Sequence, residues 1–323
     1  MKTMKKLLVI LMALALILWL AACGGSSGSP QPEKYTAEEL YDMYLNDQIT
    51  AVTECVLYGA AQGSELLISD MIYGEADALK EYDEYFLGDV YYSLIDCGLD
   101  GEKELLVCAE YLTPGENGSY LEEQFIVKAY DQELKVLTED ESFYRYVTTV
   151  YDSGLIISSG SSSEFDSYFM YEYMNAEGER VFLFSEDYYS GLAEAVIPYY
   201  EIPSDAIEGY DAWPEYAEAD GLGLSVFSLE RYEYDDYDDE KYDDYLRGHL
   251  FVFYGIDGDN CYPEEPYASM YKEAGINVCD SETADEMINK HMEESGLTQE
   301  IAEGAPAELT LLDSETVEWL PKG

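Results

Sequence analysis

Residues 92–107 read YSLIDCGLDGEKELLV and set a pattern that much of the chain repeats. Two apolar runs flank a short segment rich in aspartate and glycine. Tight turns favour these residues, because Gly reaches positive φ and Asp bonds to its own backbone. The stretch therefore predicts two antiparallel strands joined by a turn at Asp100 and Gly101.

The same alternation continues on the C-terminal side. Short segments rich in β-branched and aromatic residues are separated by turn signals such as Asp131-Gln132 and Asp152-Ser153-Gly154. Their regular spacing is typical of an antiparallel meander joined by hairpins, and it fits a sheet or a few propeller blades better than a barrel. The predicted strands are Val90–Ile95, Glu104–Tyr111, Gln124–Tyr130, Leu134–Thr138, Phe143–Tyr151, Leu155–Ser158, Ser167–Met174 and Arg180–Ser185.

Helical signals precede these strands. Thr36 and Glu39 fit a capping box, in which each side chain bonds to the other residue's backbone N–H. Apolar residues at helical spacing follow the capping box. We therefore expect helices within 37–62, 64–73 and 76–85.

The pattern becomes mixed after about residue 190. Strands are predicted near 224–234 and 249–254, and a capping box at Thr283 predicts a helix near the end of the chain. We therefore expect an α+β protein. Its N-terminal helices would pack on an antiparallel β-meander over 35–190, and a smaller mixed α/β region would occupy 191–323.

The turn after residue 95 also resembles a motif of surface lipoproteins from Gram-positive anaerobes, in which a strand ending in LID leads into DGxxELLV. Turns of this form are related to calcium loops, which supply about six to eight oxygen ligands. On that pattern Asp96, Asp100, Glu102 and Glu104 are candidate calcium ligands, Glu102 through its carbonyl. Two positions where further ligands belong hold Gly and Val. The alternative interpretation is a simple turn that Asp and Gly suit.

An export signal is predicted at the N-terminus. Lysines precede an uncharged apolar run over 7–22, and small residues end that run. The sequence LAAC at 20–23 resembles the lipobox of bacterial lipoproteins, whose cysteine sulfur carries diacylglycerol and becomes the first residue after cleavage. The resemblance implies a signal peptide over 1–22 and a lipid on Cys23, which would hold the protein on the extracytoplasmic face of the cell membrane. Gly and Ser follow, which indicates a flexible tether over 23–34. The alternative is a plain signal anchor whose cysteine is incidental.

Six cysteines are present. Cys97–Cys108 and Cys261–Cys279 are candidate local disulfides in an exported protein. Free buried thiols are the favoured interpretation, because the spacing is not that of a dense disulfide framework.

The charge of the chain excludes one class of partner. Asp and Glu number 69 against 16 Lys and Arg, which gives a net charge of −53. Such a surface repels nucleic acid, so nucleic-acid binding is excluded. Acids and tyrosines are most concentrated over 230–248, which we interpret as a solvated loop. Exposed tyrosine rings such as Tyr237 and Tyr242 can stack on sugar faces, which makes a glycan a candidate ligand.

The sequence holds no catalytic signature that we can recognise. It has only two histidines, His249 and His291, and no Cys/His cluster with zinc spacing. We therefore expect a non-enzymatic, membrane-anchored binding or accessory protein, with a glycan or another envelope protein as partner and calcium as the candidate cofactor. The alternative is a cell-envelope or glycan hydrolase that uses paired carboxylates.

Overall fold

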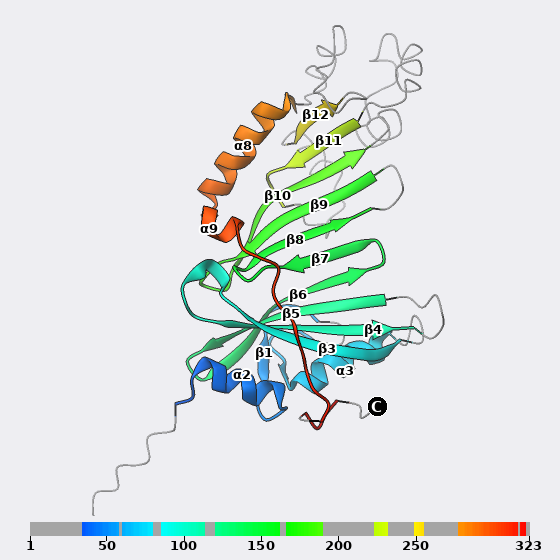
Figure 1. Ribbon diagram of the computed structural model, residues 1–323, viewed down its shortest axis with the longest axis vertical. Helices are drawn as coiled ribbons and strands as arrows, with labels where there is room; N and C mark the ends of the chain where they lie inside the picture. Colours follow the sequence, from blue (N-terminus) through cyan, green and yellow to red (C-terminus); the bar gives the residue numbers. More distant parts are fainter. Residues whose placement is uncertain are drawn as a thin grey trace, which may run out of the picture. The chain divides into compact units, whose positions relative to one another are not determined.

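The computed structural model describes residues 34–57, 60–79, 85–113, 120–161, 166–189, 223–231, 249–254, 277–315 and 317–320. Strands of these residues form one 14-stranded sheet, and helices are few (Figure 1). The expected α+β arrangement is therefore wrong, because the protein is mainly β. The strands after residue 190 extend the same sheet.

Ten consecutive strands, β3 to β12, lie side by side in the order of the sequence, each antiparallel to the next. Two short strands from the C-terminal part, β13 (Asn277–Val278) and β14 (Thr310–Leu311), pair with β12 and β3 at the two ends of this series. The ten strands are β3 (Phe86–Ile95), β4 (Glu104–Leu112), β5 (Tyr120–Tyr130), β6 (Glu133–Phe143), β7 (Tyr146–Val150), β8 (Leu155–Gly160), β9 (Asp166–Met174), β10 (Arg180–Tyr189), β11 (Gly223–Ser228) and β12 (Leu250–Tyr254).

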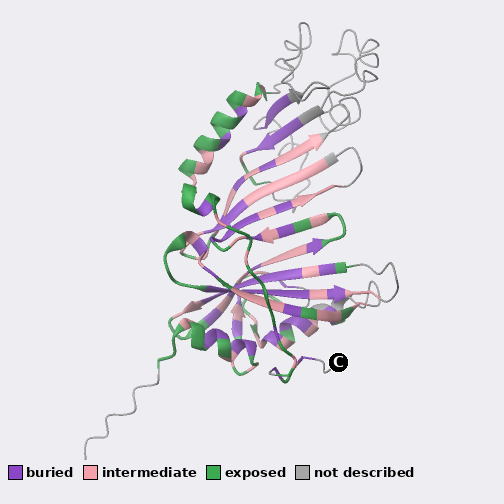
Figure 2. Ribbon diagram, in the orientation of Figure 1, coloured by how far each residue is buried: buried purple, intermediate pink, exposed green. Residues whose placement is uncertain are grey.

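Two helices, α2 (Ala37–Leu45) and α3 (Ile68–Leu79), cover one face of β4 and β5, which we call the helix-covered face. Side chains of both strands alternate between this face and the opposite one, which we call the pocket face. Figure 2 shows that β4 and β5 are largely buried as a result. The core of the helix-covered face includes Leu40, Tyr41, Tyr44, Ile68, Met71, Ile72, Leu105, Val107, Ala109, Tyr111, Phe125 and Val127.

Tyr41 connects α2 to the sheet through its buried hydroxyl. The hydroxyl donates to the carbonyl of Lys103 at 2.7 Å and accepts from the backbone N–H of Ala129 at 3.0 Å. Tyr44 is equally buried, but its hydroxyl meets only the sulfur of Met71, at 3.9 Å. The first tyrosine therefore satisfies two backbone groups, and the second mainly fills space.

The second half of the predicted helical region 37–62 is a strand. β1 (Ala51–Thr53) pairs with β6 in parallel at Leu134–Val136 and with β2 (Glu65–Leu66) in antiparallel fashion. This edge of β6 is open, because β7 pairs with β6 only where Phe143 faces Tyr146. Residues 51–53 therefore form a strand because they pair with this open edge of β6, although their local sequence has helical spacing.

Strands on the two sides of the β6–β7 hairpin contact each other through side chains of the pocket face. Arg180 of β10 donates to the hydroxyl of Thr138, at 2.8 Å, and to the carboxylate of Asp140, at 2.7 Å, both on β6. A second apolar core joins strands from both sides of the hairpin on this face. Its buried members are Ile95, Cys97, Leu106, Cys108, Ile126, Val150, Ile156 and Met174.

The C-terminal helices pack on the later strands. α8 (Ser281–Glu294) contacts β10 to β12, and α9 (Gln299–Ala302) follows it (Figure 1). The carboxylate of Asp280 caps α8 by accepting from the N–H of Thr283 at 2.7 Å, so the cap lies three residues before the predicted one. Gly296, at φ 88°, follows the helix end.

Candidate functional site

The predicted calcium turn joins β3 to β4 through a short 3-10 helix (Cys97–Leu99). One carboxylate oxygen of Asp96 accepts from the N–H of Gly101 at 3.0 Å, and the other lies 3.4 Å from the ammonium of Lys103. The carboxylate of Asp100 accepts from the N–H of Glu102 at 2.7 Å. These bonds shape the turn, as short acidic side chains commonly do.

The side chain of Glu104 lies on the pocket face and contacts the start of this turn. Its side chain is fully buried, forms an ion pair with Lys128 and accepts from the N–H of Cys97 at 2.8 Å. Burial raises the pKa of Glu104. The net pKa of Lys128 is raised: burial alone would lower it, but the hydrogen bond to Glu104 and the negative charge of Glu104 together have the larger effect.

The predicted calcium ligands are thus divided between a turn and a buried ion pair. Across the ranges that the structure describes, no group of three or more His, Cys, Asp or Glu side chains is placed to hold a metal ion. A calcium site in this turn stays a prediction. Cys97 and Cys108 are both buried free thiols. Cys23, Tyr237, Tyr242 and Cys261 lie outside the described residues.

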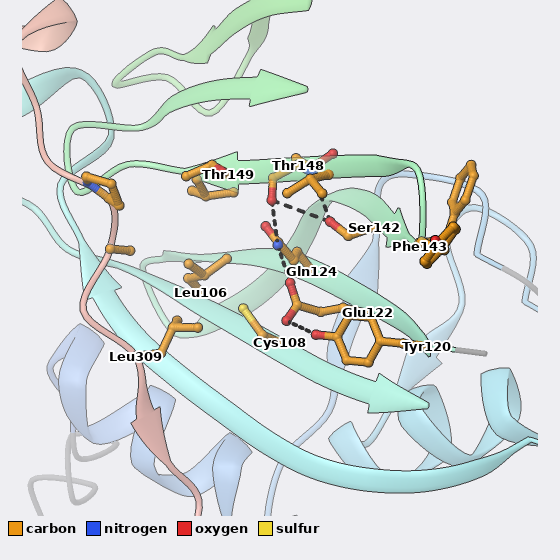
Figure 3. Close-up of a pocket in the computed structure, with 15 residues that line it drawn as sticks. Leu106, Cys108, Tyr120, Glu122, Gln124, Ser142, Phe143, Thr148, Thr149 and Leu309 are labelled. Atoms are coloured by element: carbon orange, nitrogen blue, oxygen red, sulfur yellow. Dashed lines mark hydrogen bonds between the residues drawn. The ribbon is translucent and has the colours of Figure 1, made fainter. Parts of the chain in front are cut away.

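A pocket of about 540 Å³ lies on the pocket face, beside the β6–β7 hairpin (Figure 3). Its lining comes from β4 to β7 and from residues 306–309 of the C-terminal segment. The lining residues are Leu106, Cys108, Tyr120, Glu122, Gln124, Ser142, Phe143, Tyr144, Val147, Thr148, Thr149, Val150, Pro306, Ala307 and Leu309.

The divergence of β6 from β7 creates this hollow. Where the two strands separate, side chains replace the backbone ladder between them (Figure 3). The hydroxyl of Ser142 accepts from the N–H of Thr148 at 2.8 Å, and the amide of Gln124 donates to the carbonyl of Thr148 at 3.0 Å. Polar side chains from β5 and β6 are therefore fixed at the pocket floor.

The roof of the pocket is the segment 304–309, which follows α9 and crosses from β7 to β3 (Figure 1). At β7, the N–H of Ala307 donates to the carbonyl of Val150 at 3.0 Å. In the turn that follows β7, the N–H of Asp152 donates to the carbonyl of Ala305 at 2.8 Å, and the Asp152 carboxylate accepts from the N–H of Ala305 at 2.9 Å. At β3, the roof continues into β14, and the N–H of Leu312 donates to the carbonyl of Val90 at 2.8 Å. Both ends of the roof are thus held by backbone hydrogen bonds.

Glu122 is the carboxylate of the pocket floor, and its position is fixed. One oxygen accepts from the hydroxyl of Tyr120 at 2.8 Å, and the other accepts from the amide of Gln124 at 2.6 Å. Glu110 lies directly across from Glu122 on β4. Burial, followed by the charges of Asp89 and Glu122, raises the pKa of Glu110. This end of the pocket is therefore strongly acidic.

A separate group of glutamates lies on the helix-covered face. Glu141 pairs across the ladder with Glu123, and Glu139 pairs with Phe125 of the helix-covered core. Burial, and then the charges of Glu141 and Asp140, raises the pKa of Glu139 to about 7. The sheet itself separates these carboxylates from the pocket.

Sequence reasoning missed the pocket, although one local signal was present. The segment YLEEQFIVK places Glu122 and Gln124 on the same side of a strand otherwise rich in apolar residues. Polar residues at positions that alternation assigns to an interior indicate a lined cavity or a functional surface. The roof carries no such signal.

Comparison with protein-family models, curated proteins and solved structures finds no match to this chain. The functional argument therefore depends on the geometry of the pocket.

Proposed function

We propose that the protein is a lipid-anchored, extracytoplasmic binding protein that holds a small molecule in the roofed pocket. The pocket carries this proposal. Small-molecule sites are typically concave hollows of roughly 300–1,000 Å³, mostly apolar and furnished with a few oriented polar groups. The hollow beneath 304–309 has a volume of about 540 Å³ and combines apolar walls with a fixed carboxylate and amide.

The described geometry favours binding over the hydrolase alternative. Glycoside hydrolysis needs two carboxyl groups facing each other across the bond, roughly 5–10 Å apart. Among the described residues that line the pocket, Glu122 is the single acid. Glu139 and Glu141 lie on the opposite face of the sheet.

The anchor in this proposal rests on the resemblance of LAAC to a lipobox, since residues 1–33 are not described. No helix within the described ranges has the length and apolar character needed to cross a membrane. Mass spectrometry of native protein is expected to find an N-terminal Cys23 carrying diacylglycerol, and Cys23→Ala is expected to release the protein from membranes. An intact N-terminus with an unmodified thiol would contradict the anchor.

Binding of a neutral apolar probe tests the pocket directly. N-phenyl-1-naphthylamine fluoresces in apolar cavities and is expected to bind saturably at one site. Val147 lines the pocket and is 52% exposed, so Val147→Trp adds bulk there without disturbing the core. Val56, which is 75% exposed and does not line the pocket, provides the matched control Val56→Trp.

We expect Val147→Trp to weaken probe binding at least tenfold and Val56→Trp to leave it unchanged. Absence of saturable binding to the unmodified protein, or equal binding by the two variants, would contradict the pocket as a ligand site.

A further inference from the structure

We propose that the pocket selects a molecule with an apolar body and a positively charged N–H head group, that is, a primary or secondary ammonium. This inference rests on the proposed function and specifies the chemistry of its ligand. It follows from which hydrogen-bonding groups of the floor are already engaged and which still lack a partner.

Gln124 supplies the central observation. Its side-chain nitrogen uses both protons, on Glu122 at 2.6 Å and on the carbonyl of Thr148 at 3.0 Å. Its side-chain oxygen is buried and has no hydrogen-bond partner among the described residues. The residue is only 6% exposed, and Figure 3 shows its amide group within the cavity lining. A buried acceptor without a partner costs about 1–3 kcal/mol. The oxygen has almost no accessible surface, so a ligand N–H reaches it only when the Gln124 side chain shifts toward the cavity, and a hydrogen bond made in that position recovers the cost.

Glu122 reinforces the demand for a donor. A carboxylate only accepts hydrogen bonds and has about four lone-pair sites. The bonds from Tyr120 and Gln124 occupy two of them. The remaining sites can receive N–H groups of a ligand.

The two hydroxyls nearest the Gln124 amide have no proton left to offer. Ser142 donates to the carbonyl of Thr148 at 3.4 Å. Thr148 has its hydroxyl 3.1 Å from the carbonyl of Glu141 and 3.0 Å from the hydroxyl of Ser158. Neither residue therefore supplies a donor to an anionic head group.

Charge points in the same direction. Glu110 and Glu122 face each other across β4 and β5, and Asp89 adds a third acid beside Glu110. None of the described residues that line the pocket is Lys, Arg or His. Like charges placed opposite each other on a sheet destabilise it, so a ligand cation would relieve their repulsion.

The rest of the lining suits an apolar body. Leu106, Val150 and Leu309 line the cavity, and so do the aromatic residues Tyr120, Phe143 and Tyr144. Aromatic faces attract ammonium ions, by about 0.5–2 kcal/mol depending on exposure. An amphipathic amine satisfies the acceptor, the carboxylate and the apolar walls together.

Four probes of equal chain length separate the contributions. Octylammonium carries charge and N–H donors, octyltrimethylammonium carries charge alone, octanol carries one neutral donor, and octanoate carries the opposite charge. Isothermal titration calorimetry at 150 mM salt, which screens the general attraction of cations to an acidic protein, measures all four. We expect octylammonium to bind at least tenfold more tightly than each of the other three, with octanoate the weakest.

Substitutions of Glu122 and Gln124 test whether these two residues cause the preference for octylammonium. Glu122→Gln is expected to lower octylammonium affinity at least tenfold and to leave octanol affinity unchanged. Gln124→Met removes the open acceptor at similar length, and is expected to bring octylammonium and octyltrimethylammonium to within threefold of each other. Glu133→Gln, at an exposed acid that does not line the pocket, is the matched control and is expected to change nothing. Circular dichroism and melting temperature verify that each variant is folded.

The outcomes distinguish the two proposals. If no alkyl probe binds and N-phenyl-1-naphthylamine does not bind either, the pocket is not a ligand site and the proposed function fails. If the naphthylamine binds, the pocket stands. Equal affinities for the four alkyl probes, preference for octanoate, or binding of none of the four then overturns the inference alone. An ammonium preference that survives both Glu122→Gln and Gln124→Met also overturns it.

Discussion

Replacing Glu139 by Gln is expected to stabilise the protein at pH 8 and to change its stability far less at pH 5. Glu139 lies on the helix-covered face of β6, and one of its carboxylate oxygens is buried without a hydrogen-bond partner among the described residues. Burial, the charge of Glu141 and the charge of Asp140 raise its pKa from 4.5 to about 7. The Cys55 thiol, whose own pKa is raised by burial and by Glu139, is a further neighbour.

The sign follows from proton binding. Between pH 4.5 and 7 the folded protein holds a proton on Glu139 that the unfolded chain has released. The contribution of this group to stability is therefore full below pH 4.5 and is lost as the pH rises through 7. One pKa unit corresponds to about 1.4 kcal/mol, so the shift amounts to about 3 kcal/mol. Partial exposure of the side chain reduces this to about 2 kcal/mol.

Urea denaturation followed by intrinsic fluorescence measures the effect. The lower pH should be 5, because the isoelectric point is near 4.1 and solubility is least there. The free energy of unfolding of Glu139→Gln is compared with that of the unmodified protein at the same pH. The contributions of the other acids, which titrate in both proteins, cancel in this difference. We expect a difference of about 2 kcal/mol at pH 8 and well under half of that at pH 5, at constant m value. Glu133→Gln, at an exposed position of the same strand, should show no difference at either pH.

A stability difference for Glu139→Gln that is equal at pH 5 and pH 8 would refute the reasoning. It would mean that the carboxylate of Glu139 is not held in a poorly solvated position.

Three further predictions concern the turn and its surroundings. Tyr41→Phe is expected to lower the free energy of unfolding by about 2–4 kcal/mol, because two backbone groups lose their partner. Tyr44→Phe should lower it by under about 1 kcal/mol, because the hydroxyl of Tyr44 has only a weak sulfur contact. Equal losses for the two variants in urea denaturation would contradict this prediction. Lys128→Met is expected to lower the free energy of unfolding by about 3–5 kcal/mol at neutral pH, because it leaves Glu104 charged without its ion-pair partner. Adding Glu104→Gln to the same chain should recover much of this loss. No recovery in the double variant would argue against the ion pair. Millimolar calcium distinguishes the two interpretations of the turn. A rise in melting temperature that Asp100→Asn abolishes would support a bound calcium, whereas an unchanged melting temperature would support a simple turn whose acids serve the backbone and the ion pair.

Local sequence predicted individual strands better than it predicted their assembly. Turn chemistry at Asp100 and Asp152 marks hairpin ends that depend on neighbouring residues alone, and β4 begins at Glu104 as predicted. The strand at 51–53 was mistaken for helix, because its partner is the open edge of β6, some eighty residues later in the sequence. The α+β expectation failed for the same reason, since the pairing that extends one sheet through the strands after residue 190 joins distant segments.

The candidate site shows the same division between local and distant causes. Gln124 and Glu122 could be suspected from polar residues at interior-facing positions of β5. Neither the divergence of β6 and β7 nor the crossing of 304–309 leaves a local pattern, because both depend on contacts between distant segments. A hollow formed in this way becomes visible only when the distant segments are seen together.

The origin of the roof has a consequence for biogenesis. Four strands that supply the floor and walls end by residue 150, whereas the cover is synthesised only after residue 300. A nascent molecule that has not yet reached 304–312 would present an uncovered trough with exposed aromatic rings, so the covered pocket forms only after synthesis of this segment. Proteolytic removal of the segment would return the molecule to that uncovered condition.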